Sequence, residues 1–231
     1  MNESAHPITG FFVTGTDTGV GKTLVSAALL RRFAAAGRRV AGMKPVASGA
    51  IATTQGLRSE DALILLRESS PHAAYEHVNP YALEPPIAPH LAALAAGVTI
   101  DVVRIEAAFR ALAAAADLVV VEGVGGWRVP LGPDLDVAGL AARLGLPVIL
   151  VVGLRLGCLN HAIMTAEAIH ATGLRLAGWV GTGIEPGFAA VEGNLATLHA
   201  ALRAPCLGHV PPLSSPDVRA VAGCLDLAAL R

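Results

Sequence analysis

The chain has 231 residues, a formal net charge of −1 at pH 7, and a hydrophobic content of 53% of which little is aromatic. This length suits one sizeable α/β domain with a well-buried core. With a pI near 6.7 the chain lacks the basic character of nucleic-acid-binding proteins, and no apolar run reaches the ~18 residues of a membrane span, so we expect neither partner.

Short aliphatic runs alternate with amphipathic stretches along the chain. Six runs are predicted strands, and because each is continuously apolar, we expect helices on both faces of their sheet. These strands cover residues 8–13, 39–43, 118–121, 148–152, 176–180 and 206–210. Predicted helices cover residues 22–36, 61–68, 102–116, 136–144, 160–172 and about 188–202.

This alternation predicts an α/β fold with a doubly wound, mainly parallel sheet, in a single domain over residues 1–231. Gly37, Gly145 and Gly173 each follow a predicted helix, where a glycine C-cap is expected. Residues 69–89 are rich in proline and polar residues, and we expect a long surface excursion there.

The cysteines and the first residues bear on the compartment. Cys158, Cys206 and Cys224 are widely spaced and form no Cys-x-x-Cys pair. The first seven residues lack the basic-then-apolar pattern of a signal peptide. We therefore expect free thiols and a cytoplasmic location.

A phosphate-binding loop is predicted in Gly-Thr-Asp-Thr-Gly-Val-Gly-Lys-Thr, residues 15–23, between a strand and a helix. Its glycines let backbone N–H groups converge on phosphate oxygens, Lys22 reaches the β- and γ-phosphates, and Thr23 offers its hydroxyl to Mg²⁺. Five residues, rather than the usual four, separate Gly15 from Gly21. A glycine-rich turn without a ligand is the alternative, and the flanking strand and helix disfavour it.

Lysine is rare in this chain. Lys22 and Lys44 are the two lysines among 17 basic residues, and both lie in glycine-flanked loops. An ammonium is a compact point charge, whereas a guanidinium is a broad planar fork. Lysine at these positions therefore indicates a function. Lys44 ends a predicted strand and could stabilise a transferring phosphoryl group or bind a carboxylate-like nucleophile. Ser48, in the same loop, offers a hydroxyl.

Two carboxylates are candidate Mg²⁺ ligands. Glu122 ends a predicted strand at the edge where open α/β sheets bind ligands. Asp61 lies in the first turn of a predicted helix, where it either binds the metal or complements the helix dipole. Hard oxygen ligands beside phosphates favour Mg²⁺.

Together these motifs resemble the dethiobiotin synthetase family over nearly the full length. The resemblance rests on residues 15–23, Lys-Pro-Val-x-Ser-Gly at 44–49, Ser-x-Asp-Ala-Leu at 59–63, Pro-His at 89–90, Glu-Gly-x-Gly-Gly-Trp at 122–127, Leu-Gly-Cys-Leu-Asn-His at 156–161 and Ala-Gly-Trp-Val at 177–180. It implies a homodimer that converts diaminopelargonate (7,8-diaminononanoate), CO₂ and MgATP into dethiobiotin. An amine traps CO₂ as a carbamate, the carbamate attacks the γ-phosphate to give a carbamic-phosphoric anhydride, and the second amine closes the ureido ring.

The resemblance also implies residue roles. Lys22 and Lys44 are the implied catalytic residues, and Thr23, Asp61 and Glu122 the implied Mg²⁺ ligands. The implied nucleotide-binding residues are Gly19, Val20, Gly21, Lys22, Thr23, Leu24, Asp61, Glu122, Gly123, Val124, Gly125, Thr182, Gly183, Val210, Pro211 and Pro212. The implied substrate-binding residues are Thr18, Ser48, Gly157, Cys158 and Asn160, the last three acting across the dimer interface.

Three positions depart from the family pattern. Gly19 stands where some relatives carry Glu, and Thr182-Gly183 stands where the family often has an Asn-Asp pair that reads adenine. Asn194 aligns near a position where relatives have a Tyr that contacts the substrate tail. These departures put base selectivity and the tail contact in question.

A second interpretation is a nucleotide-switch ATPase of the partitioning or metallochaperone type. Such proteins usually carry a signature lysine five residues before the loop lysine, and here that position is Asp17. A cobyric-acid-type amidotransferase would need a glutaminase region that this chain is too short to hold.

Overall fold

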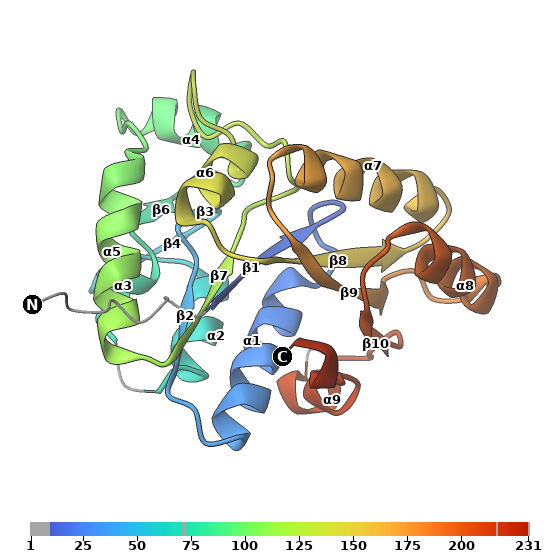
Figure 1. Cartoon of the computed structure of the whole chain (residues 1–231). Coiled ribbons are helices and arrows are strands. Elements are labelled where there is room, and N and C mark those ends of the chain that lie inside the picture. Colours follow the sequence, from blue (N-terminus) through green and yellow to red (C-terminus); the bar gives the residue numbers. More distant parts are fainter. Residues whose placement is uncertain (1–9, 71–72, 216, 231) are drawn as a thin grey trace, which may run out of the picture.

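The computed structural model describes residues 10–70, 73–215 and 217–230. Its centre is a six-stranded parallel sheet with the order β10-β9-β8-β1-β7-β2 (Figure 1). These strands are β1 (Gly10–Gly15), β2 (Val40–Met43), β7 (Leu118–Glu122), β8 (Val148–Leu154), β9 (Leu176–Gly183) and β10 (Cys206–Val210). The predicted doubly wound, parallel α/β fold is confirmed.

Helices cover both faces of this sheet. They are α1 (Lys22–Ala35), α2 (Glu60–Arg67), α3 (Tyr75–Val78), α4 (Pro89–Ala95), α5 (Val102–Ala115), α6 (Val137–Leu144), α7 (Cys158–Ala171), α8 (Val191–Ala201) and α9 (Val218–Gly223), with a 3-10 turn at Ala228–Leu230. Along β7, Val119 and Val121 pack into the core that contains α5 and α7, whereas Val120 packs into the core with α1. Continuous apolar strands therefore arise because both faces are buried.

The predicted elements match the observed ones within a few residues. β1 extends through Gly15, so the first glycine of the phosphate loop lies in the strand, and predicted strand residues 8 and 9 lie outside the described residues. Gly37, Gly145 and Gly173 end their helices with φ of 83°, 65° and 77°. Only the left-handed region gives such angles, so the glycine caps are confirmed.

The surface excursion expected over residues 69–89 is wrong. Within it lie α3 and β6 (Tyr81–Leu83), which pairs in parallel with β3 (Val46–Ser48), and Val78, Asn79 and Tyr81 are buried. Elements of three or four residues are too short to show a hydrophobic period. Long-range contacts, rather than local pattern, stabilise them.

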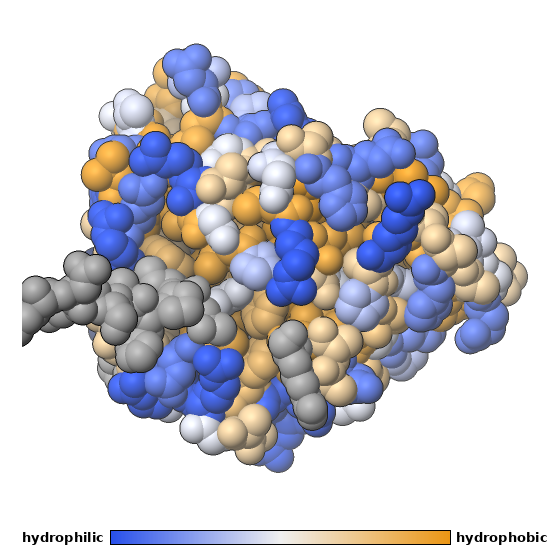
Figure 2. All heavy atoms as spheres, viewed as in Figure 1, coloured by the Kyte–Doolittle hydropathy of each residue, from blue (hydrophilic) through white to orange (hydrophobic). Residues whose placement is uncertain are grey.

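Smaller elements also escaped the sequence prediction. A hairpin joins β4 (Ile51–Thr53) to β5 (Gly56–Arg58), and α4 and α9 are short helices. On the face in view, hydrophilic and apolar side chains are interspersed (Figure 2). No helix in the described part of the chain combines the length and the apolar character of a membrane span.

Candidate active site: a cleft above the phosphate loop

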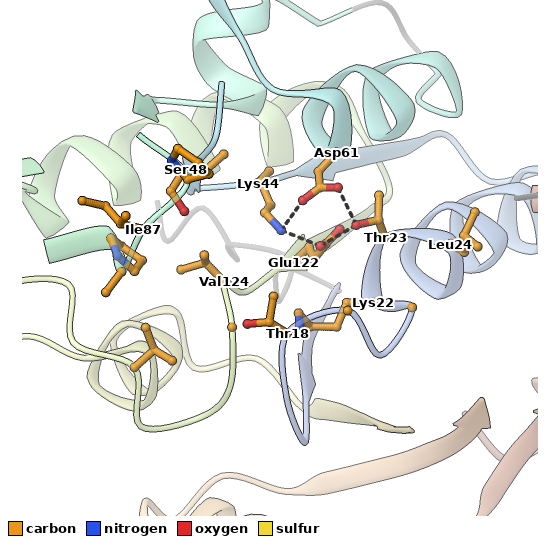
Figure 3. A pocket seen from close by; sticks show the side chains of 18 residues that line it. Thr18, Lys22, Thr23, Leu24, Lys44, Ser48, Asp61, Ile87, Glu122 and Val124 are labelled. Carbon is orange, nitrogen blue, oxygen red and sulfur yellow. Dashed lines mark hydrogen bonds and ion pairs between the residues drawn. The ribbon is translucent and has the colours of Figure 1, made fainter. Parts of the chain in front are cut away.

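A cleft of about 730 Å³ opens beside the ends of β1, β2 and β7. Parallel strands bring their carboxyl ends to one edge, so side chains far apart in sequence converge here. Twelve of the predicted site residues line it: Thr18, Gly19, Gly21, Lys22, Thr23, Leu24, Lys44, Ser48, Asp61, Glu122, Val124 and Gly125. Figure 3 shows the labelled side chains converging from separate elements.

The loop between β1 and α1 has the backbone that a phosphate site requires. Gly19 and Gly21 adopt positive φ of 75° and 88°, and Gly21 precedes α1 without a side-chain cap, so the first N–H groups of the helix face the cleft. Val20 is buried and packs against Gly15, where a Cβ would lie 2.7 Å from Val20 Cγ2. The buried valine therefore anchors the loop instead of lining the cleft.

Lys22 is held ready in this loop. Its Nζ donates to the carbonyl oxygen of Asp17 at 2.7 Å, and the side chain is almost fully buried. Burial, followed by repulsion from Lys44, lowers the pKa of Lys22 to about 8. An anion bound beside Lys22 would favour the charged ammonium and reverse this shift.

Lys44 lies in a closely packed acidic corner of the cleft. Its Nζ donates to Glu122 Oε1 at 2.5 Å and to the Gly123 carbonyl oxygen at 3.2 Å, and lies 2.9 Å from Asp61 Oδ2 (Figure 3). Burial alone would lower the pKa of Lys44, but attraction to Glu122 and Asp61 raises it above its ordinary value. Lys44 is therefore a charged ammonium with almost no contact with solvent.

Three oxygen-bearing side chains meet beside that ammonium. Thr23 Oγ1 lies 2.9 Å from Asp61 Oδ1 and 2.9 Å from Glu122 Oε1. The second oxygen of Glu122, Oε2, is buried with no hydrogen-bond partner within the described residues. Burial raises the pKa of Glu122, although the charge of Lys44 opposes this rise. At Asp61 the charge of Lys44 outweighs burial, so the pKa of Asp61 is lowered. Two carboxylates, a hydroxyl and an unpartnered oxygen suit a hard cation such as Mg²⁺.

A second cavity, of about 300 Å³, adjoins the first across Gly19, Gly21 and Leu24. Its far wall contains the predicted residues Thr182, Gly183, Val210 and Pro211, together with Ser214. Pro212 packs its ring against Gly183 and does not line the cavity. Thr182 is buried, and its Oγ1 lies 2.7 Å from the Val20 carbonyl and 3.2 Å from the Val152 carbonyl. Its hydroxyl proton is therefore committed to the backbone.

The predicted tail-binding residues do not join the cleft of their own chain. Gly157 precedes α7, and neither it nor Asn160 lines either cavity. The Cys158 side chain points into the core, with Sγ 3.5 Å from Asn194 Oδ1. A buried thiol leaves only the backbone N–H of Cys158 at the helix start for a substrate carboxylate, so the expected contact of Cys158 stays a prediction.

The comparisons with known proteins agree with this geometry. A family model described as an AAA domain matches residues 9–218. A protein of Pseudomonas paraeruginosa is 56% identical over 95% of this chain and 97% of its own length. One from Xylella fastidiosa is 52% identical over 88% of this chain and 90% of its own length. Both are named ATP-dependent dethiobiotin synthetase BioD. The chain belongs to the dethiobiotin synthetase family.

Solved structures with a similar fold include proteins named for other roles. The MinD cell division protein of Aquifex aeolicus aligns with a TM-score of 0.53 at 14% identity, over 93% of both chains. A ParA family ATPase from Chlorobium tepidum aligns with a TM-score of 0.55 at 11% identity, over 93% of this chain and 96% of its own. At such low identity these TM-scores show a shared fold and nothing about activity. The switch-ATPase interpretation is therefore not favoured over dethiobiotin synthetase.

Sequence reasoning missed part of the wall of this dethiobiotin synthetase cleft. The missed lining residues are Ala47, Pro86, Ile87, Ala88, Pro89 and Val129. Four of these six, residues 86–89, lie between the end of β6 and the first residue of α4, in the segment expected to form a surface excursion. The Pro-His motif at residues 89–90 was the available signal, because a proline in the first turn marks a helix start.

Proposed function

We propose that this chain catalyses the ATP- and Mg²⁺-dependent carboxylation and ring closure of 7,8-diaminononanoate with CO₂ to dethiobiotin. The observation that carries the proposal is the position of Lys44 between the phosphate loop and the part of the cleft lined by Ser48 and Ile87 (Figure 3). A phosphate site alone would serve any nucleotide hydrolase. A buried ammonium between the phosphate loop and the part of the cleft lined by Ser48 suits a reaction that joins two anions, a carbamate and a phosphoryl group.

The reaction joins a carbamate to a phosphoryl group. One amine of the substrate adds to CO₂, and a carbamate oxygen then attacks the γ-phosphorus while ADP departs. The second amine attacks the carbamate carbon, closes the ring and expels phosphate. Lys22 and Lys44 offset the charge that accumulates between the two anions. Ser48 and Thr18 contact the diamine or its carbamate.

The Mg²⁺ ligands in this proposal are Thr23, Asp61 and Glu122. The unpartnered Glu122 Oε2 supports the assignment, because a bound cation or its water would satisfy a buried oxygen. When bound, the metal neutralises charge on the β- and γ-phosphates. This chain's own residues orient the carbamate and hold the second amine near its carbon.

The nucleotide assignment covers both cavities. In this proposal Gly19, Gly21, Leu24, Val124 and Gly125 form the phosphate side, where Val20 and Gly123 contribute through their backbone, and Thr182, Gly183, Val210 and Pro211 form the base side, with Pro212 packed behind Gly183. The two cavities share Gly19 and Gly21, so one ATP molecule can extend from the base wall to Lys44.

The active form in this proposal is a homodimer, in which the start of α7 binds the tail carboxylate of the substrate in the neighbouring chain's cleft. Leu156 and Met164, beside that helix start and on its outer face, are 90% and 60% exposed and offer an apolar contact. Sedimentation at working concentration should give a dimer. Mixing Lys44→Arg with Asn160→Ala chains should restore up to about a quarter of native turnover, since random dimers then contain some intact sites. An active monomer, or no restoration on mixing, contradicts this arrangement.

One assay tests the activity. The protein is incubated with 7,8-diaminononanoate, ¹³C-bicarbonate and MgATP, and mass spectrometry follows the ring-closed product carrying one ¹³C. We expect one ADP and one phosphate for each molecule of dethiobiotin formed, and no ADP above background without the diamine. ATP hydrolysis that ignores the diamine would favour a nucleotide switch instead.

A further inference from the structure

Both tyrosines of the chain hold the start of a helix. Tyr75 Oη accepts the backbone N–H of Ser59 at 2.7 Å, and Tyr81 Oη accepts that of Asp101 at 2.9 Å. Ser59 is the N-cap of α2 and Asp101 the N-cap of α5. An arginine lies over each ring, Arg58 at 4.1 Å from the Tyr75 centroid and Arg104 at 4.7 Å from that of Tyr81. The two tyrosines thus make the same set of contacts at two helices.

The two helices differ in what they carry. Asp61 lies two residues after the N-cap of α2 and lines the cleft, whereas no residue of α5 lines it. A shift at the start of α2 would move the Asp61 carboxylate. A similar shift at the start of α5 would leave the cleft unchanged.

Of the two tyrosines, only Tyr75 continues into a chain of hydrogen bonds, which runs from its half-buried hydroxyl into the interior. Its hydroxyl donates to Asn79 Oδ1 at 2.9 Å, and Asn79 Nδ2 donates to the carbonyl oxygens of Lys44 at 2.6 Å and of Tyr81 at 3.2 Å. The two carbonyls beside Nδ2 fix the orientation of the amide. Ser59, Asn79 and Lys44 are each at most 4% exposed. Hydrogen bonds that all run in one direction polarise and strengthen one another, most of all at the buried end of such a chain.

The chain of contacts closes on itself through the acidic corner. The same segment holds Lys44 on its other side, because the Lys44 N–H donates to the Val78 carbonyl at 2.7 Å. Lys44 Nζ in turn lies 2.9 Å from Asp61 Oδ2. The ammonium and the carboxylate are thus positioned from both their side chains and their backbones.

We propose that Tyr75 and Asn79 are positioning residues for the reaction, which hold the start of α2 and the backbone of Lys44 at a fixed spacing. Neither lines the cleft, so they act through Asp61 and Lys44. Their consequence is that the ammonium and the carboxylate keep their separation when nucleotide, metal and carbamate bind. The inference rests on the proposed function, in which Lys44 and Asp61 contact the reacting groups.

The test compares Tyr75→Phe with Tyr81→Phe, since each loses one hydroxyl that accepts an N-cap N–H beneath an arginine. For Tyr75→Phe we expect turnover to fall about tenfold, as a displacement well under 1 Å would produce. The Mg²⁺ concentration for half-saturation, titrated calorimetrically with a non-hydrolysable ATP analogue present, should rise several-fold. Tyr81→Phe should leave both values within about twofold of native, with a comparable fall in Tm.

Asn79→Asp provides a second variant, since it replaces the donor facing the Lys44 carbonyl with an acceptor. The losses of turnover in Asn79→Asp and in Tyr75→Phe should not add in the double variant, because both substitutions break the same chain of hydrogen bonds. Equal losses of turnover in the two Tyr→Phe variants, or unchanged Mg²⁺ affinity in Tyr75→Phe, would overturn the inference. Mg²⁺ affinity is measured without the diamine. A native protein that makes no dethiobiotin would therefore refute the proposed function and leave this comparison intact.

Discussion

The phosphate loop and the acidic corner around Lys44 are built in opposite ways. The loop comes from consecutive residues, 15–23, whose geometry depends on glycine backbone angles such as those of Gly19 and Gly21. The corner joins Lys44 to Asp61 and to Glu122, 78 positions further along the chain. A local loop tolerates change in its surroundings, whereas the corner depends on every element that supports it. Substitutions should therefore affect turnover most at the corner and binding most at the loop.

Lys44→Arg is the sharpest way to break this contrast. A guanidinium has no room in a corner where Lys44 Nζ already contacts Glu122, Asp61 and the Gly123 carbonyl. We expect turnover to fall about a hundredfold, because a misplacement of about 1 Å costs that much when catalysis depends on positioning. Affinity for a non-hydrolysable ATP analogue should stay near native, since Lys22 and the loop amides carry it.

Steady-state turnover and calorimetry on the same preparation separate the two effects. Lys22→Arg is the matched control, because it makes the same chemical change in the loop and should weaken nucleotide binding. Near-native turnover in Lys44→Arg would show that Lys44 has no part in the reaction.

The phosphate loop should make nucleotide affinity depend on pH. Because the pKa of Lys22 is lowered to about 8, mainly by burial, the free protein loses the Lys22 proton above that pH. Phosphate binds the ammonium form, so the Kd for the ATP analogue should rise up to about tenfold per pH unit above about 8 and change little just below it. Calorimetry in buffers of different ionisation enthalpy should detect proton uptake on binding.

Lys22→Arg again serves as the control, since a guanidinium keeps its charge throughout this range. Its Kd should be independent of pH between about 7.5 and 9.5. The same pH dependence in that variant would assign the effect to another group.

The smallest effect is expected at the base cavity. The Thr182 hydroxyl is committed to the Val20 and Val152 carbonyls, so it cannot offer the paired donor and acceptor that an amide side chain gives. We expect kcat/KM for ATP to exceed those for GTP and CTP by less than about tenfold. A preference above about a thousandfold would mean that another group reads the base.

The contrast between loop and corner also explains what the sequence could predict. The parallel sheet, the glycine caps and the phosphate loop follow from patterns within short windows, and the structure confirms them. Lys44 and Glu122 were each predicted at the end of a parallel strand, whereas the ion pair between them was not predicted. The support beneath them was not predicted. Tyr75 lies in α3 and Asn79 directly follows it, and a helix of four residues is too short to show periodicity. Hydrogen bonds to distant backbone atoms also leave no trace in local sequence.

Gly183 adds a constraint on how this chain could change over evolutionary time. A Cβ at Gly183 would lie 2.5 Å from Pro212 Cδ and 2.8 Å from its nitrogen, atoms of a rigid ring that cannot rotate away. The Asn-Asp pair of other family members therefore cannot be reached here through Gly183→Asp alone. The proline must move or be replaced first, so the order in which mutations arise decides which routes lead from this base wall to theirs.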